Sequence, residues 1–219
     1  MPVAPPPEQT LGQMIRQRRK VVGKTLQAIA NETGLSIAFH SQVERDLSSP
    51  SLASLKLIAD ALGVGVETFV RTPEISGPVS RHQTRVSYST GMNGPSYERL
   101  SDDFVGSMLN SVIINLPVGY RAQEAVHEGE ELMYVLSGKI LCTVNGEERL
   151  LEAGDSIHFA SGLPHRTENL ADVPTRVLWV GTLRIFNKNV PTQSRGGSAL
   201  DPADPVHDAT GALSVTEGN

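Results

Sequence analysis

Hydrophobic positions follow two different periods along the chain, and the period changes near residue 71. Before that point they recur at helical spacing, as on the stretch LGQMIRQRRKVV. Residues that typically cap helices precede the later helical stretches, and glycines end the first two. The caps are Thr25, Ser36 and Ser51, and the glycines are Gly23 and Gly34. The pattern predicts an all-α bundle of short helices over residues 9–70.

From residue 85 to residue 186 the pattern changes to short β-branched and aromatic runs separated by turns. VSYST, SVIINLPV, ELMYVLSG, KILCTVNG and TRVLWVGT are typical, and Asn145-Gly146 is a signal for a tight hairpin. Many short strands at this spacing are typical of a sandwich or a small barrel. The chain is therefore predicted to be multidomain, with an all-α part followed by an all-β part.

Two segments show neither period. Residues 71–84 are rich in Pro, Gly and Ser, which predicts a linker. Residues 187–219 contain no aromatic residue and many turn formers, which predicts a disordered tail. No apolar run is long enough to span a membrane, the N-terminus lacks an apolar signal-peptide core, and Cys142 is the only cysteine. We therefore expect a cytoplasmic protein without a membrane partner or an intramolecular disulfide.

The net charge of −5 is distributed unevenly. Residues 1–72 carry eight Lys/Arg and six Asp/Glu, whereas residues 73–219 carry eleven and eighteen. Five of the eight N-terminal cations gather around the end of the first predicted helix: Arg16, Arg18, Arg19, Lys20 and Lys24. A charge run is usually a solvated face. The contrast between the two parts nevertheless favours an anionic partner for the first part.

The order KTLQAIANETGLSIAFHSQVERDLSSPSLASLKLIADALGV resembles the phage-repressor-like (XRE-type) helix-turn-helix domain over residues 9–70. The small Ala30, the turn at Gly34 and the SQVER run carry the likeness. The resemblance implies binding to double-stranded DNA as a homodimer, and an ion pair between Arg19 and Glu44. His40 stands where that family usually has an aliphatic residue, and we expect it to be a half-buried core residue.

The second helix of a helix-turn-helix is the one that can enter a major groove. Helical spacing turns Phe39 and Val43 toward the bundle. Gln42 could read adenine, and Ile37 with Ala38 could touch thymine methyl groups, although Ile37 could also be a merely exposed apolar residue. The predicted DNA-contacting residues are Thr25, Gln27, Ser36, Ile37, Ala38, Ser41 and Gln42.

Two motifs in the β-rich part resemble those of the cupin (jelly-roll) barrel, over residues 85–186. One contains Gly119, Ala125, His127, Glu131 and Gly138, and the other contains Gly154, Gly162, His165 and Asn169. The resemblance implies that His127, Glu131 and His165 converge on a divalent metal, which could be Fe, Zn, Ni or Mn. Ala125 stands at the position of a further metal-binding histidine, so this chain has one ligand fewer than the family pattern.

Two interpretations of the barrel interior stay open. Two imidazoles and one carboxylate could form the facial triad of a non-haem Fe(II) site. The same side chains could instead line a pocket for an organic ligand and bind each other or water. In both cases we expect four further residues to line the pocket: Arg121, Gln123, Ala125 and Met133.

The two domains in this order resemble bacterial transcription regulators that have a cupin sensor. The resemblance implies a DNA-binding regulator that senses a small-molecule effector, a metal or both, with no catalytic residues. A ligand in the barrel would change the arrangement of two recognition helices in a dimer. The alternative is a non-haem iron cupin enzyme resembling hydroxypropylphosphonate epoxidase, in which the helix-turn-helix domain has a structural role.

Overall fold

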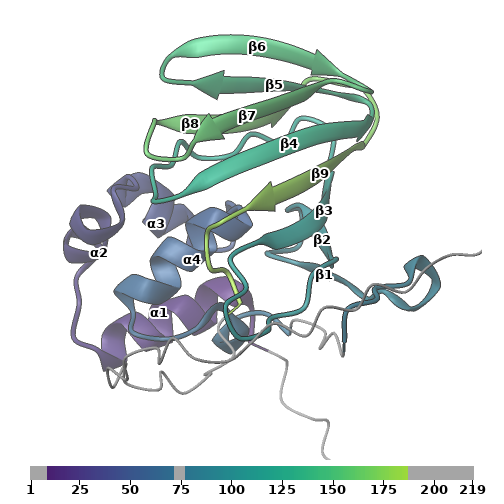
Figure 1. The fold of residues 1–219 in the computed structure, drawn as a ribbon. Coiled ribbons are helices and arrows are strands. Elements are labelled where there is room, and N and C mark those ends of the chain that lie inside the picture. Colours follow the sequence, from purple (N-terminus) through teal and green to yellow (C-terminus); the bar gives the residue numbers. More distant parts are fainter. Residues whose placement is uncertain (1–8, 72–76, 187–219) are drawn as a thin grey trace, which may run out of the picture. The chain divides into compact units, whose positions relative to one another are not determined.

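The computed structural model describes residues 9–71 and 77–186, and all of these belong to one unit. The first part is helical, as predicted. Within it lie four α-helices and a 3-10 turn (Figure 1): α1 Leu11–Val21, α2 Leu26–Thr33, α3 Ile37–Val43, α4 Leu52–Ala61 and η1 Val66–Thr68. No helix of the described residues is long and apolar enough to cross a membrane.

The helix boundaries follow from local side-chain chemistry. The hydroxyls of Thr25, Ser36 and Ser51 each accept a hydrogen bond from a backbone N–H in the first turn of the next helix, as the sequence predicted. Helix α2 ends at Gly34, whose φ of 71° is the left-handed conformation that glycine adopts without a steric penalty. The cap at the start of α2, its end at Gly34 and the cap at the start of α3 thus fix the limits of the turn between the two helices.

Helix α3 ends at Val43, so Glu44 and Arg45 of the SQVER run lie outside the helix. Asp46 adopts a positive φ of 57°. From there its carboxylate accepts hydrogen bonds from Gly12 N–H at 2.9 Å and from the Thr10 hydroxyl at 2.5 Å. These bonds tie the end of the recognition segment to the first turn of α1.

The bundle core confirms the predicted facing of α3. Phe39 and Val43 are 6% and 1% exposed and pack with Ile15, Ile29 and Leu55. His40 is also part of this interior, more completely than expected, with 3% exposed. Its Nε2 lies 2.9 Å from the Thr33 hydroxyl, which gives the buried ring a hydrogen-bond partner.

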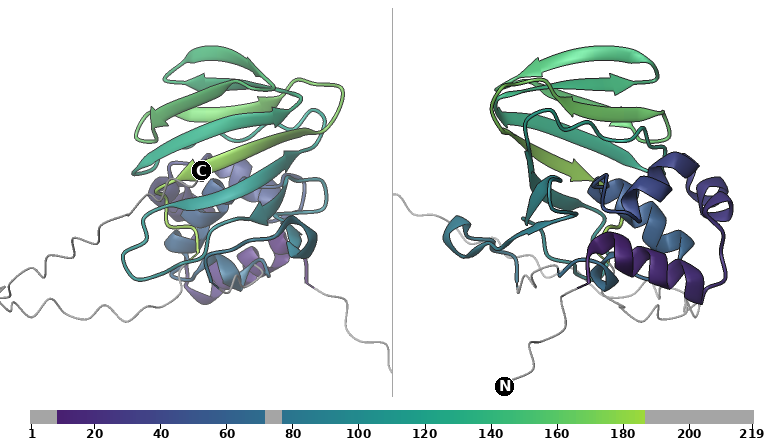
Figure 2. Two further views of the ribbon diagram at one scale, coloured as in Figure 1. Left: turned by 45° about the vertical axis from the view of Figure 1, so that its right-hand side comes forward. Right: turned by 180° about the vertical axis from the view of Figure 1, so that it is seen from behind.

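The second part is a two-sheet β barrel, as the pattern predicted (Figures 1 and 2). The strands are β1 Ser87–Ser89, β2 Ser96–Arg99, β3 Asn110–Leu116, β4 Glu130–Ser137, β5 Lys139–Val144, β6 Glu147–Glu152, β7 Ser156–Ala160, β8 His165–Asn169 and β9 Thr175–Gly181. One sheet has the order β1-β2-β3-β9-β4-β7 and the other the order β6-β5-β8. The predicted hairpin joins β5 to β6 through Asn145 and Gly146, both with positive φ.

Strand β4 alternates strictly between exposed and buried residues over Glu130–Leu136. Its inward residues are Glu131, Met133 and Val135. Strand β9 alternates in the same way and turns Trp179 inward. A short 3-10 turn, η2 His82–Thr84, lies in the predicted linker. Residues 72–76 of that linker and the predicted tail fall outside the described part of the chain.

The start of α4 and the segment before it contact the barrel through hydrogen bonds and close packing. The hydroxyl of Tyr97 on β2 accepts a hydrogen bond from Leu52 N–H at 3.0 Å. The Thr90 hydroxyl donates to the Pro50 carbonyl at 2.5 Å. Gly94 lies so close to Ser49 that an added Cβ would come within 2.5 Å of its side chain. The barrel therefore holds the segment that precedes α4 as well as its first turn.

The burial of His40 predicts a pH dependence of stability. Burial lowers the pKa of His40, with Glu44 opposing and Arg19 adding to this effect. The unfolded histidine binds a proton below its usual pKa near 6.5, whereas the folded one stays neutral to lower pH. Its contribution to stability is therefore present above pH 6.5 and is lost as the pH falls toward the lowered pKa.

We expect His40→Leu to flatten this dependence between about pH 5 and 7 in urea unfolding followed by helical circular dichroism. His82→Gln is the matched control, because His82 is exposed. An unchanged pH profile in His40→Leu would contradict the assignment.

The predicted pair of Arg19 and Glu44 is present and bidentate, with N–O distances of 2.5 and 2.7 Å, and it joins α1 to the end of α3. The side chains are only 14% and 7% exposed. Because removal of Glu44 leaves a largely buried guanidinium, Glu44→Ala should lower the free energy of unfolding by about 1.5–3 kcal/mol. The exposed pair of Arg149 and Glu147 provides a control, with ~0–1 kcal/mol expected for Glu147→Ala. A double-mutant cycle that shows no coupling between Arg19 and Glu44 would refute this estimate.

Candidate metal centre and DNA-contacting surface

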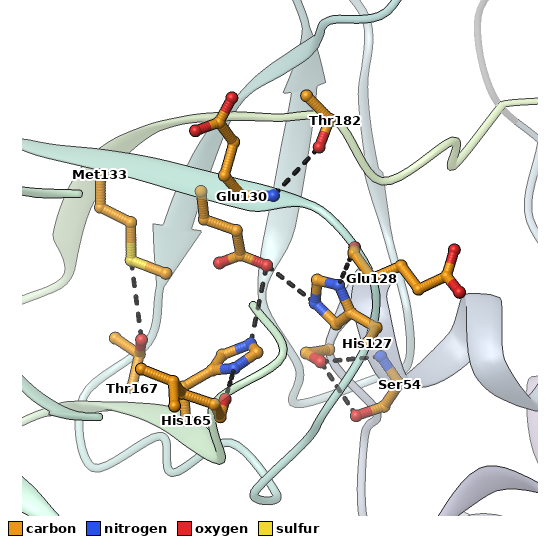
Figure 3. A network of polar contacts seen from close by, with 11 residues as sticks. Ser54, His127, Glu128, Glu130, Met133, His165, Thr167 and Thr182 are labelled. Carbon is orange, nitrogen blue, oxygen red and sulfur yellow. Dashed lines mark hydrogen bonds and ion pairs between the residues drawn. The ribbon is translucent and has the colours of Figure 1, made fainter. Parts of the chain in front are cut away.

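Three side chains from separate segments meet inside the barrel. Glu131 lies on the inward side of β4, His165 begins β8, and His127 precedes β4. They are 2%, 6% and 8% exposed, respectively. Their ligand atoms lie within 4.8 Å of one another. Figure 3 shows the rings of His127 and His165 turned toward a common point.

Backbone pairing sets the separation of the two histidines. Ala125 and His165 form an antiparallel bridge in which each N–H donates to the other carbonyl at 3.0 Å. The N–H of His127 donates to the Ser161 carbonyl at 3.0 Å. These backbone hydrogen bonds hold the segment that carries His127 next to the segment that carries His165. Residues 38 positions apart in the sequence are held with ring centroids 5.0 Å apart.

Hydrogen bonds at the far side of each ring fix its tautomer. Nδ1 of His127 lies 3.1 Å from the Glu128 carbonyl, and Nδ1 of His165 lies 2.8 Å from the Leu163 carbonyl. A carbonyl oxygen only accepts, so each Nδ1 carries the hydrogen. In a neutral ring the lone pair is then on Nε2, which faces Glu131. Metal-binding histidines are usually oriented by this kind of contact.

The Nε2 atom of His127 has an unsatisfied position. It lies 2.8 Å from Oε1 of Glu131, yet it is buried and no hydrogen bond of acceptable geometry reaches it. The Nε2 of His165 lies 3.6 Å from the same oxygen. Two imidazole nitrogens and one carboxylate are ligands that zinc and iron accept. The residues therefore fit a divalent metal, which would use the lone pair that the protein leaves without a partner.

The electrostatics of the centre also call for a positive charge. Burial acts to raise the pKa of Glu131, but the close contacts with His127 and His165 outweigh it and lower that pKa to about 2. Burial lowers the pKa of His165, and contacts with Glu131 outweigh this effect and raise it. A buried carboxylate that stays ionised needs compensation. Imidazole protons or a metal ion would provide it.

A small cavity adjoins the centre. Its volume is about 80 Å³, whereas sites for drug-sized ligands occupy about 300–1,000 Å³. A water-sized sphere needs roughly 10–15 Å³ by the same measure, so the space corresponds to about five to eight such spheres. Its walls are mostly apolar, with Glu131, His165, Thr167 and Gln123 among the polar residues. The cavity suits a small ligand with an apolar body and one polar end.

Of the residues expected to line the pocket, Gln123, Ala125 and Met133 do so. Arg121 lies elsewhere: its side chain is 62% exposed, and its Nε is 3.3 Å from Glu168. The sequence reasoning missed Tyr97 and Trp179, which also line the cavity. The alternation along TRVLWVGT could have indicated that Trp179 faces inward. No local signal marks Tyr97, because β2 reaches the cavity only through pairing with β3.

The residues expected to contact DNA lie on α2 and α3 or on their caps. Ser41 is half-buried and the other six are exposed. The exposed residues are Thr25, Gln27, Ser36, Ile37, Ala38 and Gln42. The hydroxyls of Thr25 and Ser36 serve as helix caps, which leaves them near the helix N-termini. Arg45, two residues after the end of α3, is also exposed, and the sequence reasoning did not include it.

Comparisons with known proteins agree with this division of the chain. The helix-turn-helix family matches residues 9–69, and the cupin domain family matches residues 112–181. The chain is 25% identical to the HTH-type transcriptional regulator PuuR of Escherichia coli, over 83% of this chain and 95% of that protein.

Two solved structures resemble the fold. An HTH_3 family transcriptional regulator from Vibrio cholerae has a TM-score of 0.48 and 22% identity, over 78% of this chain and 94% of that one. Hydroxypropylphosphonic acid epoxidase from S. wedmorenis has a TM-score of 0.41 and 19% identity, over 78% and 95%. By the two matching family models, residues 9–69 form an XRE-type helix-turn-helix domain and residues 112–181 form a cupin domain.

Proposed function

We propose that the barrel of this DNA-binding transcription regulator is a sensor for a small ligand bound beside a divalent metal at His127, Glu131 and His165. The observation that carries the proposal is the pair of buried imidazoles, each with Nδ1 bound to a carbonyl and Nε2 facing one ionised carboxylate. When bound there, a metal with three protein ligands would supply open coordination positions for an oxygen or nitrogen of the ligand.

The DNA-binding part of the proposal rests on the surface of α3. Gln42, Ile37 and Ala38 are exposed on this short helix, and Phe39 and Val43 fix its other side in the core. A glutamine can bind adenine through two hydrogen bonds in the major groove. A single short recognition helix reads few bases, so regulators of this kind use two copies on a two-fold operator. We accordingly infer a cytoplasmic homodimer.

A ligand in the cavity would touch the helical domain directly. Ser51, Leu52 and Ala53, at the start of α4, line the cavity together with Tyr97. The Tyr97 hydroxyl also accepts the hydrogen bond from Leu52 N–H. Because α4 shares the bundle core with α3 through Leu55, Ile58 and Val43, a shift at its first turn would reach the recognition helix. Occupancy of the cavity and DNA affinity are then coupled reciprocally.

The size of the cavity limits the ligand class. A volume that corresponds to about five to eight water-sized spheres admits only a small molecule. Its apolar part would lie against Val112, Val177 and Trp179, and its polar end would lie near Glu131. A second function, oxygen-dependent chemistry by a non-haem iron enzyme, is favoured by the same donor set of two histidines and one glutamate. The two functions differ in whether the bound small molecule is converted.

The first test is DNA binding by the full chain. We expect binding to duplex DNA at low salt, with about −0.9 in the log–log salt slope for each phosphate neutralised. At a site selected from a random-sequence duplex pool, Gln42→Ala should cost about 1–3 kcal/mol, measured by fluorescence anisotropy. Gln17→Ala on the exposed side of α1 is the control and should change nothing. If the folded protein binds no duplex at low salt, the regulator function is wrong.

The second test is metal binding, titrated by calorimetry with Fe(II), Zn(II), Ni(II) and Mn(II). Glu131→Gln keeps the shape of the side chain but removes its charge, so binding should be lost while circular dichroism stays unchanged. Glu130→Gln, the neighbouring residue on the outer side of β4, should bind like the parent. Ala125→His should tighten binding, because position 125 pairs directly with His165.

If none of the four metals binds to the parent protein, the barrel is a pocket for organic ligands and the iron-enzyme alternative falls with the metal. If iron binds, oxygen consumption that depends on a small substrate would favour the enzyme. The sensor predicts a change in DNA affinity with metal or ligand, without turnover.

A further inference from the structure

The outer side of β4 is apolar, although its inner side already supplies the core. Leu132, Tyr134 and Leu136 alternate with the inward residues and are 39%, 40% and 41% exposed. Antiparallel strands that face water usually place polar residues on that side. Exposed apolar patches of this kind mark interaction sites.

Strand β9 extends the patch. In the register of the two strands, Leu132 lies opposite Val180, and Tyr134 lies opposite Leu178, so all four side chains share the outer side. Figure 1 shows β4 and β9 side by side along the sheet. Leu178 and Val180 are half-buried. We name the surface formed by Leu132, Tyr134, Leu136, Leu178 and Val180 the β4–β9 face.

Opposite charges mark the two ends of this face. Glu130 lies at one end, with its side chain 58% exposed. Arg176 lies at the other end, opposite Ser137, with its side chain 42% exposed. The point midway between Glu130 and Arg176 lies between two rows of the face, which are the cross-strand pairs Leu132–Val180 and Tyr134–Leu178. The face is therefore apolar in the middle, anionic at one end and cationic at the other.

We propose that the β4–β9 face is the surface on which a second copy of this chain docks, about a two-fold axis that lies in the interface and crosses the strands. Such an axis reverses the strand direction between the copies. It therefore places Glu130 of each copy opposite Arg176 of the other, and the Leu132–Val180 row opposite the Tyr134–Leu178 row. A two-fold interface needs a patch that is complementary to itself in this way.

The charge arrangement favours a second copy over an unrelated partner. An unrelated partner needs complementarity only to the face as a whole, whereas a second copy needs an anion and a cation at matching distances from the midpoint. Two sheets that pack face to face also keep their strands within about 30° of each other, which suits this antiparallel arrangement. The proposal rests on the proposed function only in that a two-fold dimer suits a two-fold operator.

The first test is the oligomeric state of the full chain, measured by sedimentation equilibrium over a range of concentrations. We expect the parent to dimerise. Leu132→Glu places an unpaired carboxylate near the centre of the interface, so it should raise the dimer dissociation constant at least about tenfold. Leu150→Glu is the matched control, because Leu150 is 54% exposed but lies on β6 in the other sheet, and it should leave the dissociation constant unchanged.

Charge reversal tests the axis itself. Glu130→Arg and Arg176→Glu alone each bring like charges together across the interface and should weaken the dimer. The double variant Glu130→Arg/Arg176→Glu restores opposite charges between the copies. Within each copy it removes the contact between position 130 and His158, and it places a carboxylate at position 176 beside Glu98. A recovery of dimerisation in the double variant therefore arises between the copies.

Three results would overturn the proposal: a parent that stays monomeric, a dimer that neither Leu132→Glu nor the single charge reversals weaken, or a double variant without recovery. Circular dichroism of each variant verifies that it is folded. If Leu132→Glu fails to fold, the charge variants still test the surface, because they change only exposed side chains. Loss of duplex DNA binding by the parent would refute the regulator function and leave the dimer surface standing. Dimerisation unaffected by the variants, with DNA binding intact, would refute the surface alone.

Discussion

The register of strand β4 determines which of its side chains face the inside of the barrel and which face the outside. Its odd-numbered residues place Glu131 and Met133 inside, beside the two histidines, and its even-numbered residues place Leu132 and Tyr134 outside. A slip of one residue would exchange these sets, exposing the carboxylate and burying the apolar outer row against the imidazoles. Pairing with β9 on one side and β7 on the other holds the register. The candidate metal centre and the proposed dimer surface are thus two consequences of a single strand alignment.

A buried anion is the second constraint, and it explains why the centre is built as it is. The pKa of Glu131 is lowered by its contacts with both imidazoles, and the hydrogen bond from each Nδ1 to a backbone carbonyl turns Nε2 of that ring toward the carboxylate. In this arrangement the backbone selects the tautomer, the tautomer orients the lone pair, and the carboxylate supplies the charge that a cation would balance. Removing a member of the trio leaves the others without their partner, so the three residues act as one unit, and antiparallel bridges at Arg121–Glu168 and Ala125–His165 connect the segments of the two histidines.

Much of this was predictable from the sequence, because it depends on local patterns. The helix caps, the Asn145–Gly146 hairpin and the strand ELMYVLSG are each encoded within a few residues, and the resemblance to the cupin motifs implied the trio. The end of α3 was not predictable, since it depends on Asp46 turning back to bind α1, 34 residues earlier. The position of Arg121 depends on an ion pair with Glu168, and the place of Tyr97 in the cavity wall depends on strand order. Such contacts between distant segments leave no periodic trace in the sequence.

Ala125 has two roles, one through its backbone and one through its side chain. Its backbone performs a structural task, pairing with His165 through two hydrogen bonds, which an alanine does as well as a histidine. Its side chain contributes only a methyl group to the wall of the cavity, where the family pattern has another metal ligand. An alanine at this position therefore keeps the geometry of the candidate centre, leaves more space next to it, and would leave three protein ligands for a metal. A site of that kind holds a metal less completely and leaves more of it to a small molecule, which is the property that a sensor requires and a purely structural metal site avoids.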